Sequence, residues 1–351
     1  MDAIDEGYDG GARETVVIRS PEDLIASVPS MIGFTPGSGS VVVVCGERAG
    51  GRTGPVVRLD AHGMLGIDDG FGPVGTIDEG PARGMAAYCR REGVRDAHLV
   101  VVHENCADDP VAERQAADAA DAFEYWLGCA GTEIKGAFGV GGFARGARWV
   151  DLRGLAGGTQ GDPDASEIAA RHAVGGRVRA ADRAEIEALY ADRDPDACDI
   201  DPHPGGAPLV GGKRAVRRAV ALHDETALAM STGDEAGGGV DDEVLAEVGT
   251  SLRDIAVRDA VYEHLAGAPL TVHDGRRSLW WALARRRPAP ERARGLLLLG
   301  AAAYFAGSGV HARAALDAAV EADPHDGLAP LLLEGLDRGI SPDDIRGLAV
   351  A

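Results

Sequence analysis

The segment from Arg19 to Cys45 reads RSPEDLIASVPSMIGFTPGSGSVVVVC and contains the signals for a helix, a turn and a buried strand. Ser20 is a predicted helix N-cap, because its hydroxyl can accept a hydrogen bond from a backbone N–H of the first turn. Pro21 suits the first helical position, where its missing N–H costs nothing, and Asp23 suits the positive end of the helix dipole. We therefore predict a helix that begins at Pro21. Asp23 is expected to stabilise the N-terminal end of this helix and not to be a catalytic residue.

The second half of the segment predicts the end of that helix and a strand after it. Pro29 disfavours helix at the residue before it and is expected to start a second short turn, which ends at Gly33. Residues 36–39 are a proline- and glycine-rich connector. The valines at 41–44 form a continuous β-branched run, which is typical of a strand covered on both faces.

Helix and strand patterns continue to alternate further along the chain. We predict strands at 55–60, 98–103, 134–140 and 148–152, and helices at 81–89, 110–127, 166–173 and 181–190. Residues 139–146 are interpreted as a hairpin turn, and the residues after Gly154 as loops. The alternation predicts an α/β layer structure with a mixed sheet.

Composition divides the chain into four parts. Residues 1–13 are acidic and rich in glycine, and we expect a disordered tail. The α/β domain spans 14–190. Residues 191–212 are dominated by Asp, Pro and Gly and are a predicted linker. From residue 213 to 351 the pattern is helical, which predicts an all-helical C-terminal domain.

The C-terminal domain contains one pattern typical of a repeat. The register of a tetratricopeptide repeat, counted from Ala293, places small or apolar residues where two helices approach closely: Leu299, Gly300, Ala312, Leu316 and Ala319. Pro324 then falls where the second helix ends. A repeat array normally needs about three units, so one unit predicts a helical hairpin within a small bundle in preference to a peptide-binding superhelix.

The opening motifs resemble those of a known family. These motifs are Ser-Pro-x-Asp-Leu at 20–24, Val-Pro at 28–29, Gly-Phe-x-Pro at 33–36 and Ser-Val-Val at 40–42. Together they resemble the start of an actinobacterial family catalogued as a domain of unknown function, number 4192. The resemblance extends through most of the chain, although the family usually has a cysteine- and proline-containing segment where this chain has residues 157–163. The resemblance implies a host group and no mechanism.

The charge balance limits the classes of partner. The 351 residues include 45% apolar residues and carry a net charge of −21. This charge argues against broad binding to nucleic acid or anionic membranes, because neutralising phosphates needs a dense basic face. Lys135 and Lys213 are the only lysines, which we interpret as codon bias in a GC-rich genome. A salt-adapted proteome is the alternative explanation for the acidity.

Cysteine usage and the apolar runs indicate a compartment. The five cysteines are odd in number and lack paired spacing: Cys45, Cys89, Cys106, Cys129 and Cys198. This pattern is typical of free thiols in a reducing cytoplasm. The N-terminus lacks the apolar core of a secretory signal, and the run at 295–307 is too short to span a membrane. We expect a cytoplasmic protein without membrane association.

The best candidate for chemistry is the end of the strand at His103. Ligands in open α/β sheets gather beyond the carboxyl ends of strands. His103 and Glu104 could perform acid–base chemistry together with Asp60, which ends another strand, and Asn105 could bind a ligand. A polar loop that caps the next helix through Asp108 or Asp109 explains the same residues.

Other candidate sites are weaker. Asp23 and Ser40 belong to the family-like motif and are further candidate binding residues. The sequence predicts no metal site, because His103 and Cys106 lack a matching second pair of ligands, and it identifies no cofactor. The glycines at 37–39 precede a strand, which is the wrong order for a phosphate-binding loop. The basic segment 213–218 could meet an acidic partner or phosphate, or be a solvated helix face.

The sequence supports two functional hypotheses. The first is a non-enzymatic binding or scaffold protein that offers a surface of the helical domain to a protein partner. The alternative is an enzyme or small-ligand-binding protein that uses Asp60, His103 and Glu104 at the strand ends.

Overall fold

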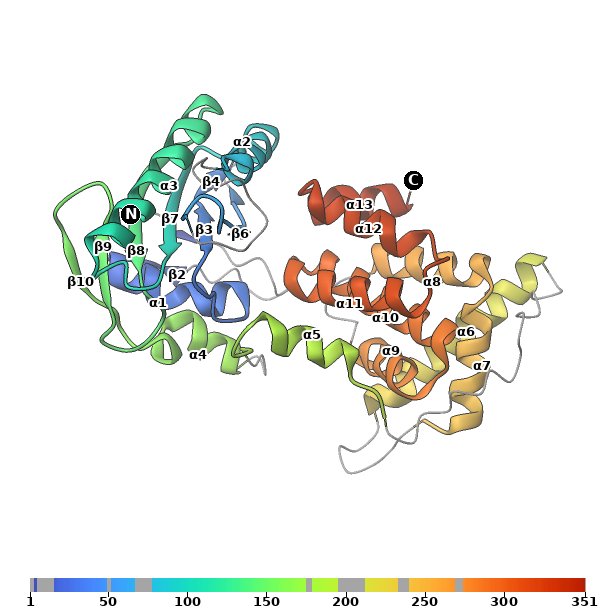
Figure 1. The fold of residues 1–351 in the computed structure, drawn as a ribbon. Coiled ribbons are helices and arrows are strands. Elements are labelled where there is room, and N and C mark those ends of the chain that lie inside the picture. The colour runs from blue at the N-terminus through green and yellow to red at the C-terminus, as the bar shows by residue number, and fades with distance from the viewer. Residues whose placement is uncertain are drawn as a thin grey trace. The chain divides into compact units, whose positions relative to one another are not determined.

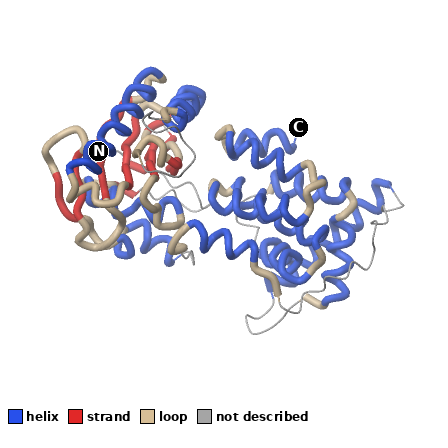
Figure 2. The backbone as a smooth tube through the Cα atoms, in the orientation of Figure 1, coloured by secondary structure: helices blue, strands red, loops and turns tan. Residues whose placement is uncertain are grey.

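The computed structural model describes residues 3–4, 16–48, 52–66, 78–174, 179–194, 212–232, 240–268 and 274–350. These residues group into two compact units that divide between Arg183 and Ala184 (Figure 1). The described strands all belong to the first unit, and the second unit is helical (Figure 2). Most of the predicted tail and of the predicted linker lies outside the described residues, so the predicted domain boundaries stay predictions.

The first unit is built on a six-stranded mixed sheet with the strand order β10-β9-β8-β7-β3-β6. Its strands are β3 (Ser40–Cys45), β6 (Val56–Asp60), β7 (Asp96–Val102), β8 (Glu133–Val140), β9 (Arg148–Asp151) and β10 (Gly157–Thr159). β7 and β8 are parallel, and the other neighbouring strands are antiparallel. The predicted α/β class with a mixed sheet is confirmed. Two short pairs lie outside this sheet: β1 (Ala3–Ile4) with β2 (Val16–Val17), and β4 (Glu47–Arg48) with β5 (Arg52–Thr53).

Strand β10 lies where the sequence predicted only loops, so that part of the prediction was wrong. Gly158 of β10 pairs with Trp149 of β9. A Cβ atom on Gly158 would come within 2.9 Å of the indole Nε1 of Trp149, so glycine permits this close approach. A glycine-rich edge strand has no hydrophobic alternation, which is why the pattern did not reveal it.

Helices cover both faces of the sheet, and β3 is buried throughout. These helices are α1 (Pro21–Ile32), α2 (Gly80–Glu92) and α3 (Pro110–Cys129). Val41 and Val43 pack with α2 and α3, whereas Val42 and Val44 pack with α1. Burying an aliphatic side chain of this kind contributes about 1.5–3 kcal/mol. The predicted two-sided burial of the valine run is confirmed.

Helix α1 begins as predicted and continues further than predicted. The Ser20 hydroxyl accepts a hydrogen bond from the backbone N–H of Asp23 at 3.2 Å. The helix runs through Pro29 without a second turn and ends at Gly33, which has φ 84° and donates to the Pro29 carbonyl at 3.0 Å. The predicted break was wrong, because Val28 and Pro29 are buried and this packing outweighs the backbone hydrogen bond that a proline cannot make. A short helix η1 (Pro163–Ala165) and α4 (Glu167–Val174) pack on α1.

The second unit consists of helices around a central α10. They are α5 (Arg183–Ala191, from Ala184 onward), α6 (Gly212–Thr232), α7 (Asp242–Leu252), α8 (Ile255–Gly267), α9 (Asp274–Arg286), α10 (Ala289–Phe305), α11 (Gly309–Ala322), α12 (Leu328–Asp337) and α13 (Pro342–Val350). Within the described chain, no helix has both the length and the apolar composition needed to cross a membrane.

The predicted helical hairpin is formed by α10 and α11. A Cβ atom on Gly300 of α10 would lie 2.6 Å from Cγ of Leu316 and 3.3 Å from the carbonyl oxygen of Ala312, both in α11. Only glycine permits this approach of the two helices. Pro324 follows the end of α11, as predicted.

Candidate functional site

Several of the predicted site residues lie at one edge of the sheet. Ser40, the first residue of β3, pairs in register with Asp60, the last residue of β6, and with Val102, the last residue of β7. The backbone N–H of His103 then donates to the carbonyl of Val140, the last residue of β8, at 3.0 Å. This sheet edge therefore gathers the ends of three strands and the start of a fourth.

Asp60 and His103 share the edge and extend from opposite faces of the sheet. Side chains alternate along a strand, so Ser40 and Asp60 lie on the same face as Val42 and therefore toward α1. His103 lies on the other face, where its Nε2 is 3.1 Å from Oε1 of Gln115 in α3. The sheet thus separates the two side chains.

Asp60 instead joins a charged cluster on the α1 face. Its Oδ1 is hydrogen-bonded to Nδ1 of His62, and its Oδ2 lies 3.5 Å from the Arg58 guanidinium. Nε of Arg58 donates to the Ser40 hydroxyl at 3.0 Å. Burial alone would raise the pKa of Asp60, but the hydrogen bond with His62 and the charge of Arg58 hold it below its usual value.

His62 was not identified from the sequence, and its position depends on a glycine. Gly39 has φ 86°, and a Cβ atom there would come within 2.5 Å of the His62 ring. The imidazole therefore packs directly over the Gly39 backbone. The sequence signal was the spacing Asp60-Ala61-His62 directly after a strand, opposite a Gly-Ser turn.

The loop after β7 is explained largely by its backbone hydrogen bonds. The N–H of Glu104 donates to the Ser38 hydroxyl at 3.0 Å, and Asn105 has φ 59°, in the left-handed region. The Asp109 carboxylate accepts from the N–H of Val111 at 2.9 Å and so caps α3, as the alternative interpretation predicted.

Two further residues that the sequence analysis considered, Cys106 and Asp23, have little reactivity. Burial raises the pKa of the Cys106 thiol to about 12, so at neutral pH it is a protonated core residue. Asp23 is exposed in the first turn of α1. Among the described residues, no group of three or more His, Cys, Asp or Glu side chains could hold a metal ion.

A second candidate site lies in the helical unit, and the sequence did not reveal it. A cavity of about 520 Å³ lies among α8, α10, α12 and α13. Its apolar lining comprises Ile255, Tyr262, Leu328, Leu331 and Leu348. We call this cavity the apolar groove. Its volume falls in the range of about 300–1,000 Å³ that is usual for ligand pockets.

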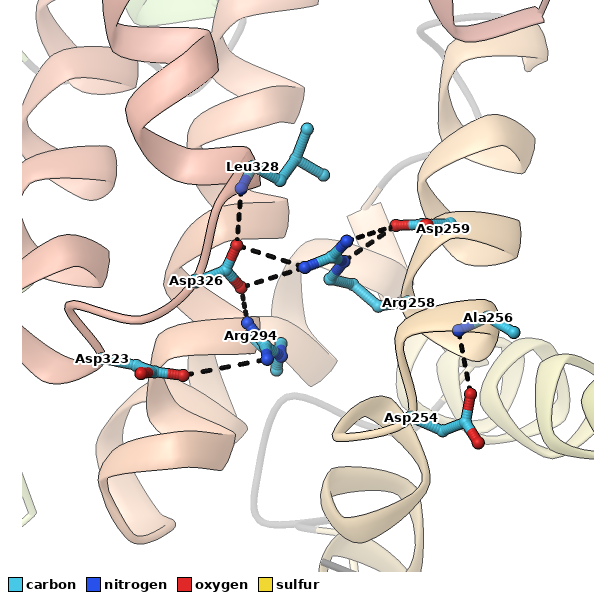
Figure 3. Close-up of polar contacts among 8 residues, drawn as sticks. All are labelled: Asp254, Ala256, Arg258, Asp259, Arg294, Asp323, Asp326 and Leu328. Atoms are coloured by element: carbon cyan, nitrogen blue, oxygen red, sulfur yellow. Dashed lines mark hydrogen bonds and ion pairs between the residues drawn. The ribbon is translucent and has the colours of Figure 1, made fainter. Parts of the chain in front are cut away.

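Buried charges also line the apolar groove. Figure 3 shows their contacts. Arg258 of α8 donates to both carboxylate oxygens of Asp326, at 3.2 and 3.3 Å. Arg294 of α10 pairs with the same carboxylate, and burial lowers the pKa of this arginine. Asp326 also accepts from the N–H of Leu328 at 2.7 Å, which caps the start of α12. The cluster therefore fixes α12 against α8 and α10.

Comparison with known proteins supports the family resemblance. Residues 21–343 match the model of a family described as a domain of unknown function, DUF4192. No curated protein and no solved structure matches the chain significantly. The matched range begins at the first residue of α1 and ends in α13, so it includes the sheet edge and the lining of the apolar groove except Leu348.

Proposed function

The chain belongs to the DUF4192 family, whose description names no activity, and from this premise we propose that it is a non-enzymatic protein-binding scaffold. In this proposal the apolar groove of the helical unit holds a short segment of another protein. The segment inserts at least two large apolar side chains between α8, α12 and α13.

The observation that carries the proposal is the exposure of the groove rim. Ile255, Leu331 and Leu348 come from three different helices and are 61%, 62% and 73% exposed. Single exposed aliphatic residues are ordinary on a protein surface, whereas several that meet at one cavity are typical of an interaction site. Removing this apolar area from water favours a complex, and the gain is offset in part by the cost of ordering the two partners.

The charged lining supports an apolar occupant as well. Arg258 and Arg294 are already paired with Asp326, and all three residues are buried. An apolar side chain that packs on these three residues therefore leaves none of them as an unpaired buried charge, which would be costly. The same ion pairs hold α8 and α12 in place, so this part of the groove exists before the partner arrives.

Peptide selection tests the proposal. The full chain is used to select binders from a random peptide library, and the selected peptides are titrated by fluorescence anisotropy. We expect peptides with paired large apolar residues, and we expect Leu331→Glu or Leu348→Glu to weaken them by at least about tenfold, or about 1.4 kcal/mol. Leu155→Glu, at an exposed leucine of the α/β unit, is the matched control. Binding that is indifferent to both groove variants would refute the proposal.

A second candidate function is small-ligand binding at the sheet edge. The observation that favours it is the convergence of Arg58, Asp60 and His62 on one face, next to Ser40. A thermal-shift screen with a metabolite panel tests it, because a ligand that binds the native state raises the melting temperature. A compound that raises the melting temperature of the natural protein but not that of Asp60→Asn would support ligand binding at the sheet edge. If no compound has this effect, the candidate function fails.

A further inference from the structure

The first turns of α6 carry a strongly basic face. Lys213, Arg214, Arg217 and Arg218 are all exposed. In the part of the chain that the structure describes, none of these four side chains makes a hydrogen bond or an ion pair. We call these four residues the basic face of α6. Their isolation is unexpected in a protein with 56 acidic and 35 basic residues.

The arrangement opposes the stability of the helix. The four cations lie at the N-terminal end of α6, where the helix dipole is positive, and the first turn has no acidic residue. Lys213 and Arg217, and likewise Arg214 and Arg218, are like charges at i, i+4 spacing, which repel each other. Among the described residues no contact offsets this repulsion, and an external anion would do so.

The basic face lies next to the apolar groove. A second cavity, of about 400 Å³, is lined by Lys213, Val216 and Arg217 of α6 and by Ala256 of α8. Ala256 directly follows Ile255, which lines the apolar groove. The two cavities therefore flank the first turn of α8, and α6 and α8 lie side by side in Figure 1.

We propose that the partner segment carries acidic residues next to its apolar anchors, and that their carboxylates bind the basic face of α6. This inference rests on the proposed function, since it assigns the charge of the same partner. The net charge of −21 does not prevent the contact, because charges are largely screened beyond about 8 Å at physiological ionic strength. A nucleic acid fits less well, because the adjoining groove is lined by aliphatic side chains and by the carboxylates of Asp259 and Glu263, which repel phosphates.

The test compares matched peptides and matched variants. One selected peptide is made in two forms, with its acidic residues intact or replaced by Asn and Gln. Each form is titrated by fluorescence anisotropy against the natural protein and against Arg214→Glu/Arg217→Glu. Arg145→Glu in the α/β unit, at another exposed arginine, is the control for charge reversal.

We expect the neutral peptide to bind about tenfold more weakly than the acidic one to the natural protein. The α6 double variant should lose that difference, and high salt should reduce it. The double variant should also melt at a higher temperature than the natural protein, since a glutamate at position 214 suits the first turn of the helix and both changes replace repulsive i, i+4 pairs with attractive ones. A higher melting temperature would show that the double variant is folded, so that its weaker binding is not caused by unfolding.

Each alternative outcome has a distinct meaning. If both peptides bind equally and only Leu331→Glu weakens them, the inference fails and the proposed function stands. If the α6 variant abolishes binding while Leu331→Glu does not, the groove proposal fails. If single-stranded DNA displaces the peptide at a similar affinity, the basic face binds nucleic acid and the inference of an acidic protein segment fails. A selection that returns no peptide overturns both proposals.

Discussion

The Arg258 guanidinium donates to both carboxylate oxygens of Asp326, and the two residues lie 68 positions apart in the sequence. Both residues are buried, at 8% and 4% exposure. The contact joins α8 to the start of α12, and these two helices supply most of the wall of the apolar groove. The stability of the unit and the shape of its binding surface therefore depend on the same pair.

Asp326→Asn is expected to destabilise the helical unit by about 3–5 kcal/mol, because it removes the buried counter-charge that two guanidinium groups share. Arg258 then keeps only the half-exposed Asp259, and Arg294 keeps only Asp323 at 3.8 Å. Urea unfolding followed by far-UV circular dichroism measures the change. Glu334→Gln is the control, since it breaks an exposed pair with Arg338 that is worth about 0.3–0.5 kcal/mol. A cost below about 1 kcal/mol for Asp326→Asn would show that the cluster does not hold α12 in place.

Gly300→Ala and Gly347→Ala are expected to change stability in opposite directions. Both glycines lie inside helices, where alanine is favoured by about 1 kcal/mol. A Cβ atom at Gly347 meets nothing within 4 Å, whereas one at Gly300 would overlap Leu316. Gly347→Ala should therefore raise the melting temperature and Gly300→Ala should lower it, with overpacking that costs about 1–3 kcal/mol. An increase for both would contradict the close approach of α10 and α11.

The contact between Gly39 and His62 can be isolated by a double-mutant cycle. Gly39 and Gly33 have nearly the same positive φ, 86° and 84°, but only Gly39 has a side chain above it. Gly39→Ala should therefore cost at least about 1 kcal/mol more than Gly33→Ala. In the His62→Ala background that excess should disappear. An excess that persists there would mean that the imidazole does not pack on the Gly39 backbone.

The stability of the helical unit is expected to depend on pH through His311. Its Nδ1 lies 3.1 Å from the Tyr190 hydroxyl, and burial, assisted by the charge of Arg277, lowers the pKa of this imidazole. The unfolded chain therefore binds a proton at this position more readily than the folded chain, so stability falls as the pH decreases through 6.5. The loss is at most about 1.4 kcal/mol per pH unit.

His311→Gln keeps a polar partner for the Tyr190 hydroxyl and removes the titration. Urea unfolding at about pH 7.5 and about pH 5.5 compares the two proteins across the pH range in which the unfolded histidine titrates. The natural protein should lose more stability than the variant between these two values. Equal losses would show that His311 is as readily protonated in the fold as in the unfolded chain.

The sequence predicted local structure well because its signals are local. The Ser20 cap, the valine strand and the Gly300 hairpin each depend on residues close together in the chain. The break at Pro29 was mispredicted because burial against the sheet, a tertiary effect, decides that position.

The two sites differ in how far the sequence could predict them. The sheet edge was located from strand ends, but only the register shows that Asp60 and His103 lie on opposite faces. The apolar groove combines four helices from Ile255 to Leu348, and no sequence period relates them. The basic segment at 213–218 is evident in the sequence, whereas its position beside the groove is evident only in the structure.

Amide hydrogen exchange of the full chain, with and without a selected peptide, tests the central proposal most directly. Binding in the apolar groove predicts slower exchange at the start of α8, through α12 and in α13, together with the first turns of α6. The sheet edge around Asp60–His62 and His103–Asn105 should be unchanged. Protection at the sheet edge, with none in α8 and α12, would contradict the proposal.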